Sequence, residues 1–390
     1  PAAPVDPNAP AGPAAEAACA PQPSTEVGVT DTEVRIGSIG TISGAIAGFG
    51  TTGRNAMTAY FEMINAQGGV CGRQLRLVTG DDGLDAGRNR SETQRLAAEV
   101  IGFAGGVTVV DNGGADILAG TNIPDVSLAI GVNRGLLPNN FSPNPIDPSQ
   151  PGNGTIAVMQ YFASQGVTSA AVIWPAQADA RLRGQAFVHD LNQAGIADVQ
   201  TFEVQITETN YGPVAQQIAN AGTQLVLTAL EVSGMARLAQ AFQQVGYTPQ
   251  VPFYGAQAYG QQFIELAGAA AEGTTIAVTF SIFEDAPNVP AMQQFVEWYG
   301  RVAPGNNPDF FAIMSWASAD MIVDAVRAAG PAPTRDAMIA YLQTLTEYTG
   351  DGFLAPRNPA GKVTGNCFAI VGVRNGQWQR IEPAAGFLNC

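Results

Sequence analysis

The segment from Val34 to Asp82 constrains the fold more than any other part of the chain, because its hydrophobic pattern changes from strand to helix and back. Small and apolar residues over 34–39 predict a short buried strand. Apolar residues then recur at helical spacing, at Ala56, Tyr60, Met63 and Ile64. Gly68-Gly69 end this helix, and 75–78 predict the next strand. A strand–helix–strand unit of this kind forms a parallel pair with a right-handed crossover.

The loop after the first strand, expected over 41–53, lies at the carboxyl edge of that sheet, where ligands bind in open α/β sheets. Its end, Gly48-Phe49-Gly50-Thr51-Thr52-Gly53, matches the glycine pattern of dinucleotide sites, and Asp81 could act as the ribose-binding acid. The pattern begins well after the strand ends, so we favour two other interpretations. The segment is either a flexible loop that leads into a helix or a helix N-terminus that holds an anionic group.

Strands and helices alternate through most of the chain, which predicts a doubly wound α/β fold. Further strands are expected at 103–110, 126–130, 169–174, 199–204, 225–230, 252–255 and 274–280. Further helices are expected at 86–101, 116–120, 155–164, 180–194, 214–220, 234–245, 291–299, 311–329 and 335–345.

The length of 390 residues predicts two lobes, because single hydrophobic cores rarely exceed about 250–300 residues. A Pro-rich stretch at 138–154 without apolar periodicity marks one crossing between them, and 281–290 and 351–362 mark two more. We therefore predict an α/β protein with two doubly wound lobes and three hinge crossings. Lobe 1 comprises 31–146 and 283–352, and lobe 2 comprises 147–282 and 353–390. Such a clamp suits the enclosure of a small molecule.

Residues 1–30 are expected to form a Pro/Ala-rich tether, because 16 of the first 24 residues are Pro or Ala and this stretch has too few large apolar residues to build a core. No apolar run approaches the roughly 18–20 residues needed to span a bilayer. A tether ahead of a globular domain predicts an extracytoplasmic protein, in the periplasm or on the cell surface. Lipid anchoring through a cysteine of the precursor stays open, and Cys19 lacks the apolar signal core that a lipid site needs.

Charge and composition exclude several functions. The net charge of −15 argues against nucleic acid or an anionic membrane as a partner. A single histidine, His189, excludes an HExxH zinc site, and its neighbours predict a surface or half-buried helix position. No P-loop is present, which disfavours a nucleotide-dependent enzyme. We expect no cofactor and no metal.

The four cysteines are too dispersed for a zinc site, and their even number favours two disulfides in an oxidising compartment. Cys19 precedes the first strand and Cys71 begins the second, so both lie at the amino edge of the sheet. Cys367 and Cys390 flank a predicted hairpin that turns at Asn375-Gly376. We expect the pairs Cys19–Cys71 and Cys367–Cys390, with four free buried thiols as the alternative.

Three motifs carry a resemblance that extends from 34 to 381. They are VTDTEVRIGSIGTISGAIAGFG at the first strand, INAQGGVCGRQLRLVTGDD after the first helix, and the late hairpin GKVTGNCFAIVGVRNGQW. Together they resemble the solute-binding receptors of ABC importers, specifically the branched-chain amino-acid-binding family with the type I periplasmic-binding fold.

The resemblance implies a ligand site between the lobes. In lobe 1 it places Thr108 and the backbone of Ala129-Ile130-Gly131 at the polar head of the ligand, with Phe49 and Phe311 as apolar contacts. In lobe 2 the corresponding positions are Asp179, Glu231 and Gln257, with Trp174 and Tyr259 as nearby aromatics that could also contact the ligand. This chain departs from the family in having Gln257 where an acid is expected and acids where aromatics are common. Thr108 could instead simply end a strand, Asp179 could cap a helix, and Glu231 could be solvated.

The resemblance further implies a monomeric, non-enzymatic receptor that delivers a small polar or amphipathic solute to an ABC permease in the membrane. A branched-chain or related amino acid is the leading ligand. Amides and urea-like compounds are alternative ligands. Aromatic acids are less favoured as ligands, because no Arg or Lys falls at the implied positions. A ligand sensor is the alternative that uses the same clamp, and a nucleotide-dependent or hydrolytic enzyme is the least favoured reading.

Overall fold

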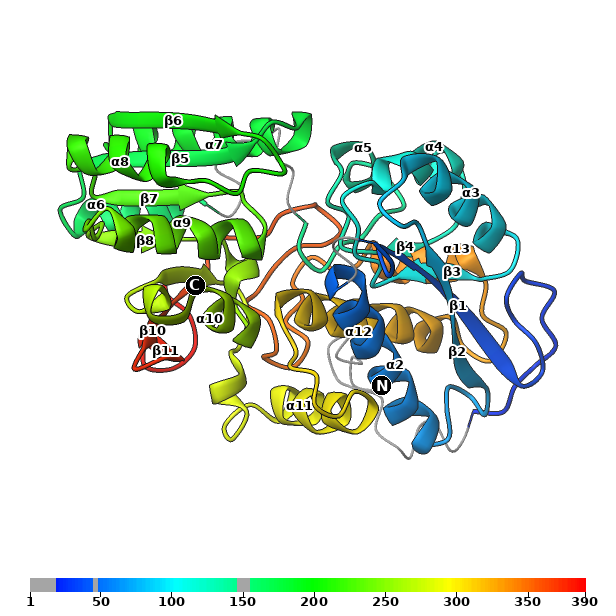
Figure 1. Ribbon diagram of the computed structural model, residues 1–390. Coiled ribbons are helices and arrows are strands. Elements are labelled where there is room, and N and C mark those ends of the chain that lie inside the picture. The colour runs from blue at the N-terminus through cyan, green and yellow to red at the C-terminus, as the bar shows by residue number, and fades with distance from the viewer. Residues whose placement is uncertain (1–18, 45–47, 146–154) are drawn as a thin grey trace.

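The computed structural model describes residues 19–44, 48–145 and 155–390, which form two α/β lobes side by side (Figure 1). Most of the predicted tether, residues 1–18, lies outside the described residues. Its described part runs along lobe 1, where the backbone N–H of Gln22 donates to the carbonyl of Pro331 (3.0 Å) and the Arg73 guanidinium donates to the carbonyl of Gln22.

The sheet of lobe 1 has four parallel strands in the order β2-β1-β3-β4. They are β1 (Glu33–Gly40), β2 (Gln74–Asp81), β3 (Gly102–Ala104) and β4 (Asp125–Val126). The last two are shorter than expected. After β3 the chain turns at Gly105 (φ +65°), and a Cβ on Gly106 would lie 2.3 Å from the carbonyl oxygen of Ile39. The backbone therefore packs directly against β1 at a point where the sequence alone suggests a continuing strand.

The helices of lobe 1 cover both faces of this sheet. They are α2 (Gly48–Ala66), α3 (Ala86–Ala97), α4 (Ala115–Leu118), α5 (Val132–Gly135), α11 (Pro290–Val302), α12 (Phe310–Ala329) and α13 (Arg335–Leu342), with the 3-10 turn η1 (Asp111–Gly114). The almost fully buried α12 packs against α2 (Figure 1). Gly53 permits this contact, since a Cβ there would lie 2.7 Å from Ser315 Oγ.

Helix α2 begins at Gly48, so the expectation of a loop up to Gly53 is wrong. The backbone N–H of Gly50 donates to the carbonyl of Thr41 (3.1 Å), and a Cβ on Gly50 would lie 2.6 Å from that oxygen. Gly50 thus lets the helix approach the end of β1, and Gly53 lets it approach α12. Close packing accounts for these two glycines without a dinucleotide.

The sheet of lobe 2 has seven strands in the order β11-β10-β9-β8-β7-β5-β6. They are β5 (Ser169–Pro175), β6 (Asp198–Val204), β7 (Leu225–Thr228), β8 (Val251–Phe253), β9 (Thr275–Val278), β10 (Ala369–Arg374) and β11 (Gln377–Glu382). The helices are α6 (Ile156–Ser164), α7 (Ala178–Gln193), α8 (Gly212–Ala221), α9 (Val232–Gln244) and the unpredicted α10 (Gln261–Ala267), with 3-10 turns η2 (Ala256–Ala258), η3 (Gly268–Ala271) and η4 (Phe283–Asp285).

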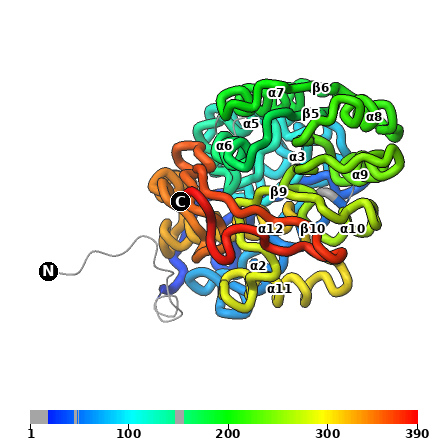
Figure 2. The backbone as a smooth tube through the Cα atoms, turned by 90° about the vertical axis from the view of Figure 1, so that its left-hand side faces the viewer, coloured from blue at the N-terminus to red at the C-terminus, as the bar shows by residue number. Residues whose placement is uncertain are grey.

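The chain returns from lobe 1 to complete this sheet with the predicted hairpin, and Figure 2 shows β10 beside β9. Strands β10 and β11 pair antiparallel around Asn375 (φ +55°) and Gly376 (φ +71°). Two successive positive φ angles are those of a type I′ turn, so the Asn-Gly signal is confirmed.

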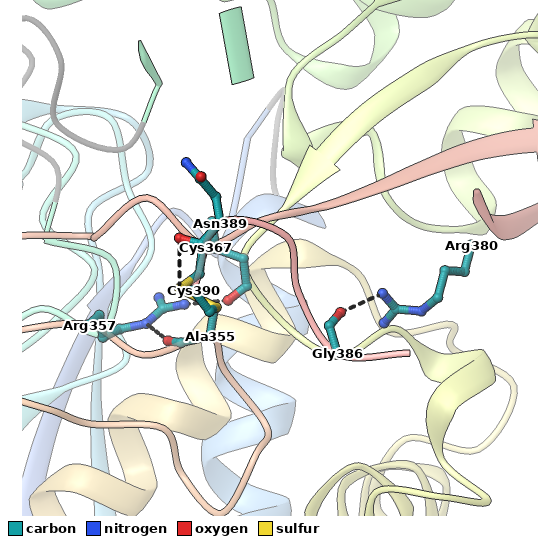
Figure 3. The surroundings of a disulfide bond; sticks show 8 residues. Ala355, Arg357, Cys367, Arg380, Gly386, Asn389 and Cys390 are labelled. Atoms are coloured by element: carbon teal, nitrogen blue, oxygen red, sulfur yellow. Dashed lines mark hydrogen bonds between the residues drawn. A yellow bond between two sulfur atoms is a disulfide. The ribbon is translucent and has the colours of Figure 1, made fainter. Parts of the chain in front are cut away.

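Both predicted disulfides are present, Cys19–Cys71 with a Cα–Cα distance of 4.7 Å and Cys367–Cys390 with 4.8 Å. The first joins the segment before β1 to the turn before β2. The second closes the chain around the hairpin, and Figure 3 shows its surroundings, which include Ala355 and Arg357.

Arg357 joins three segments that pass between the lobes. Its Nε donates to the carbonyl of Ala355 (3.0 Å), and its two terminal nitrogens donate to the carbonyls of Pro143 and Thr279. The side chain is 3% exposed, and burial lowers the pKa of its guanidinium to about 9. One buried cation thus ties the segments that follow β4, β9 and α13.

Candidate ligand-binding site between the lobes

Thr108 lies at the carboxyl edge of the lobe 1 sheet, in a buried hydroxyl network. The Thr41 hydroxyl donates to Asp82 Oδ1 (2.8 Å) and lies 3.1 Å from Thr108 Oγ1. Thr108 Oγ1 also accepts from the backbone N–H of Val110 (3.2 Å). These bonds fix the loops after β1, β2 and β3 to one another.

The neighbouring Asp81 holds the loop after β1. Its Oδ1 accepts from the backbone N–H groups of Ile42 (2.9 Å) and Gly83 (3.1 Å), and its Oδ2 accepts from the Ser43 hydroxyl (2.5 Å). Burial by itself would raise the pKa of Asp81, but these hydrogen bonds lower it to about 2. Asp81, the candidate ribose-binding acid, is therefore already hydrogen-bonded to the loops of its own lobe.

The segment Ala129-Ile130-Gly131 follows β4 at the same edge. The N–H groups of Ile130 and Gly131 both donate to the carboxylate of Asp111, each over 2.8 Å. Ala129 has a left-handed backbone (φ +48°), which turns these two N–H groups toward one acceptor. Asp111 is 3% exposed, and burial raises the pKa of its carboxyl to about 6. A buried carboxylate of the chain thus occupies this pair of backbone donors.

Asn112 connects this edge to lobe 2. Its Oδ1 accepts from the N–H groups of Asn133 (3.0 Å) and Arg134 (3.3 Å) at the start of α5. Its Nδ2 donates to Oδ2 of Asp179 (3.1 Å), in the first turn of α7 directly after β5. The loops at the carboxyl ends of the two sheets therefore meet, and Asp179 stands at their junction.

Glu231 and Gln257 lie together on lobe 2. Glu231 is the exposed N-cap of α9, and its carboxylate accepts from the N–H groups of Ser233 (2.8 Å) and Gly234 (2.6 Å). Gln257 Nε2 donates to the carbonyl of Leu230 (3.4 Å), next to Glu231. The carboxylate of Glu231 caps its helix and stays accessible to solvent.

Tyr259 and Phe311 belong to an aromatic cluster between the lobes. The Tyr259 hydroxyl donates to Glu284 (2.8 Å) and accepts from the N–H of Phe283 (2.7 Å), while its carbonyl accepts from the N–H of Phe310 (3.3 Å). Both Tyr259 and Phe311 are buried, at 1% and 6% exposed. Burial raises the pKa of Glu284, which stands within the same cluster.

The structure places Thr108 and Ala129-Ile130-Gly131 in loops at one edge of the lobe 1 sheet, and Asp179 opposite this edge on lobe 2. Glu231 lies with Gln257, and Tyr259 lies in one aromatic cluster with Phe311. Phe49 lies in the first turn of α2, and its side chain lies outside the described residues. The reasoning from sequence missed Asp111 and Asn112, although both follow a strand at the ligand-binding edge. Their position directly after a predicted strand could have marked both as candidate site residues.

Other kinds of site find no support in the described part of the chain. It contains no cluster of three or more His, Cys, Asp or Glu side chains that could hold a metal ion. None of its helices is both long and apolar enough to cross a membrane. His189 is exposed on α7, as expected, with Nδ1 3.3 Å from Asp190. A hollow of about 450 Å³ opens on lobe 1 beside Asn112, between α3, α4 and α5, but no implied ligand residue lines it.

This geometry defines a class of protein: two α/β lobes, joined by a three-segment hinge, whose ligand-binding sheet edges meet. A family model described as periplasmic binding protein matches residues 33–377. The chain therefore belongs to the periplasmic binding protein family, and the predicted type I fold is confirmed.

Several solved structures share the fold. A putative branched-chain amino acid ABC transporter from Rhodospirillum rubrum is 24% identical, with a TM-score of 0.68 over 90% of this chain and 100% of that one. A fatty acid ABC transporter substrate-binding protein from Thermomonospora curvata is 19% identical, with a TM-score of 0.76 over 93% and 94%. An ABC-transporter solute-binding protein from R. palustris in complex with benzoate is 18% identical, with a TM-score of 0.72 over 91% and 97%. A comparison with curated proteins gave no match.

Proposed function

We propose that the chain is an extracytoplasmic receptor of an ABC importer that closes its lobes around a small polar or amphipathic solute. The observation that carries the proposal is the bond from Asn112 to Asp179, which joins the ligand-binding edges of the two sheets. Closure removes water, so charges and hydrogen bonds in the cleft act in a medium of lower dielectric constant. The receptor acts as a monomer, without catalysis, and passes its solute to a membrane permease.

A branched-chain or related amino acid is the leading ligand, and small organic acids are the second candidate. The names of similar proteins support both, because they include a branched-chain amino acid transporter, a fatty acid binder and a benzoate complex. We propose that Thr108, Asp179, Glu231 and Gln257 lie within reach of the solute in the closed form. The exposed carboxylate of Glu231 suits an ammonium or amide group.

A thermal-shift screen followed by calorimetric titration tests the proposal. The panel should contain branched-chain amino acids, their amides, benzoate, medium-chain fatty acids and nucleotides. A true ligand at 100 times its dissociation constant should stabilise the folded protein by about 2.7 kcal/mol. A response to nucleotides alone, with none to the other compounds, would contradict the receptor function.

A further inference from the structure

Arg183 lies on lobe 2, in α7, one helical turn after Asp179. Residues four positions apart in a helix lie on the same face. Asp179 accepts its hydrogen bond from Asn112 of lobe 1, so this face of α7 meets the other lobe at its first turn. Arg183 is therefore placed beside the junction of the lobes, just behind the carboxyl end of β5.

The guanidinium of Arg183 has no hydrogen bond or ion pair with any part of the chain that the structure describes, although the side chain is half-buried. Its neighbour Arg181 is exposed and pairs with Glu203 of β6 through two hydrogen bonds, of 2.9 and 2.6 Å. Burial lowers the pKa of the Arg183 guanidinium. A partly desolvated cation without a partner costs free energy. That cost points to a function in ligand binding.

The loop after β4, at the opposite edge on lobe 1, is unsuited to an anionic group. Its two backbone donors, at Ile130 and Gly131, are already bound to the Asp111 carboxylate. A Cβ on Gly131 would lie 2.5 Å from Asp111 Oδ1, so the carboxylate and the backbone are packed closely. An anionic ligand group at this edge would have to displace a buried carboxylate of the same charge.

We propose that Arg183 binds the carboxylate of the solute from lobe 2. The proposal rests on the proposed receptor function and adds a residue and a chemical class to it: the ligand is a small organic acid, amino acids included, whose acidic end faces lobe 2. A guanidinium can donate two parallel N–H groups to one carboxylate, which fixes both its position and its orientation. This assignment reverses the expectation that no basic residue serves the cleft.

Matched pairs of compounds and variants test the assignment. The compounds are L-isoleucine with L-isoleucinamide, benzoate with benzamide, and octanoate with octanamide. The variants are Arg183→Gln, Arg183→Lys and the control Arg181→Gln, which removes an exposed, paired arginine from the same helix. Dissociation constants are measured by calorimetric titration at low and high salt.

We expect the wild type to bind at least one carboxylate and to bind its amide much more weakly. Arg183→Gln should weaken the binding of that carboxylate about tenfold or more and reduce the salt dependence of binding. Arg183→Lys should lose less affinity, and Arg181→Gln should bind like the wild type. Equal binding by Arg183→Gln and Arg181→Gln would overturn the proposal. Binding of the amides alone would overturn it and leave the receptor function intact. No binding by any of the six compounds or the nucleotides would count against both.

The stability of the ligand-free variant separates a binding role from a structural one. If Arg183 serves the ligand, Arg183→Gln removes an unpaired, partly desolvated charge, so its melting temperature without ligand should equal or exceed that of the wild type. A clear fall in the ligand-free melting temperature would show that Arg183 supports the fold, and would contradict the assignment.

Discussion

Replacing Arg357 by methionine should destabilise the protein strongly, because one side chain serves three segments between the lobes. The substitution keeps an unbranched side chain and removes its hydrogen bonds to the carbonyls of Pro143, Thr279 and Ala355. The carbonyl of Thr279 keeps a second donor, the N–H of Ala355 (2.9 Å). The other two carbonyls have no further donor in the described part of the chain.

A buried carbonyl that loses its donor costs about 1–3 kcal/mol, so two of them cost about 2–6 kcal/mol. Removing a buried charge offsets part of this cost. We therefore expect Arg357→Met to lower the free energy of unfolding by about 2–5 kcal/mol. Arg357→Lys keeps the charge but has fewer donors in reach, so its free energy of unfolding should lie between those of Arg357→Met and the wild type.

Urea-induced unfolding followed by tryptophan fluorescence measures the effect. Arg90→Met is the matched control, because Arg90 forms an exposed ion pair with Asp116 and should leave the unfolding midpoint almost unchanged. If Arg357→Met and Arg90→Met unfold at the same urea concentration, the three carbonyl bonds do not stabilise the hinge and the reasoning is wrong.

Three further variants test local features. Burial raises the pKa of Asp111 to about 6, so the folded protein binds this proton more tightly than the unfolded chain, and the free energy of unfolding should fall as the pH rises to about 6. Asp111→Asn should remove this fall, which urea unfolding from pH 4 to 7 measures. If the free energies of the variant and the wild type change in parallel with pH, Asp111 is not the cause. Gly184→Ala would place a Cβ 2.3 Å from the ring of Trp174 and should cost about 1–3 kcal/mol, whereas an unchanged melting temperature would mean that the two elements can separate freely. Replacing Cys19 and Cys71 together by serine opens a loop with a sequence separation of 52 and should cost about 4 kcal/mol in chemical unfolding; a loss under about 1 kcal/mol would refute the estimate.

The features predicted well from the sequence are those that local chemistry determines. The Asn375-Gly376 turn needs two positive φ angles, which these residues adopt readily, and it sets the register of β10 and β11. The disulfide pairs followed from the order of the strands, since Cys19 and Cys71 both precede strands that pair in parallel. The alternation of strands and helices was sufficient to predict two α/β lobes.

The errors lie where distant parts of the chain decide the local structure. The loop expected up to Gly53 is helical from Gly48, because Gly50 packs against the end of β1. The strand expected at 103–110 ends at Ala104, because Gly106 approaches Ile39 too closely for the strand to continue. Hydrophobic periodicity carries no information about such contacts.

The positions of some candidate site residues in the fold were predicted from the sequence. Thr108 and Asp179 were placed at the correct edges, since each follows a strand of a parallel sheet. Asp111 and Arg183 were not singled out, because their significance depends on partners: Asp111 fills backbone donors from a different loop, and Arg183 lacks a partner in the described chain. A sequence shows which side chains carry charge, but pairing becomes visible only when the lobes are assembled.

The proposed receptor must close its two lobes around a small solute, and the distance between the lobes reports this closure. Spin labels on the exposed Ser91 of α3 and Gln193 of α7 would report this distance by pulsed electron paramagnetic resonance. With a solute that calorimetry shows to bind, we expect a shorter mean distance between the labels and a narrower distribution of distances than without it. An unchanged distribution at saturating solute would contradict closure of the lobes.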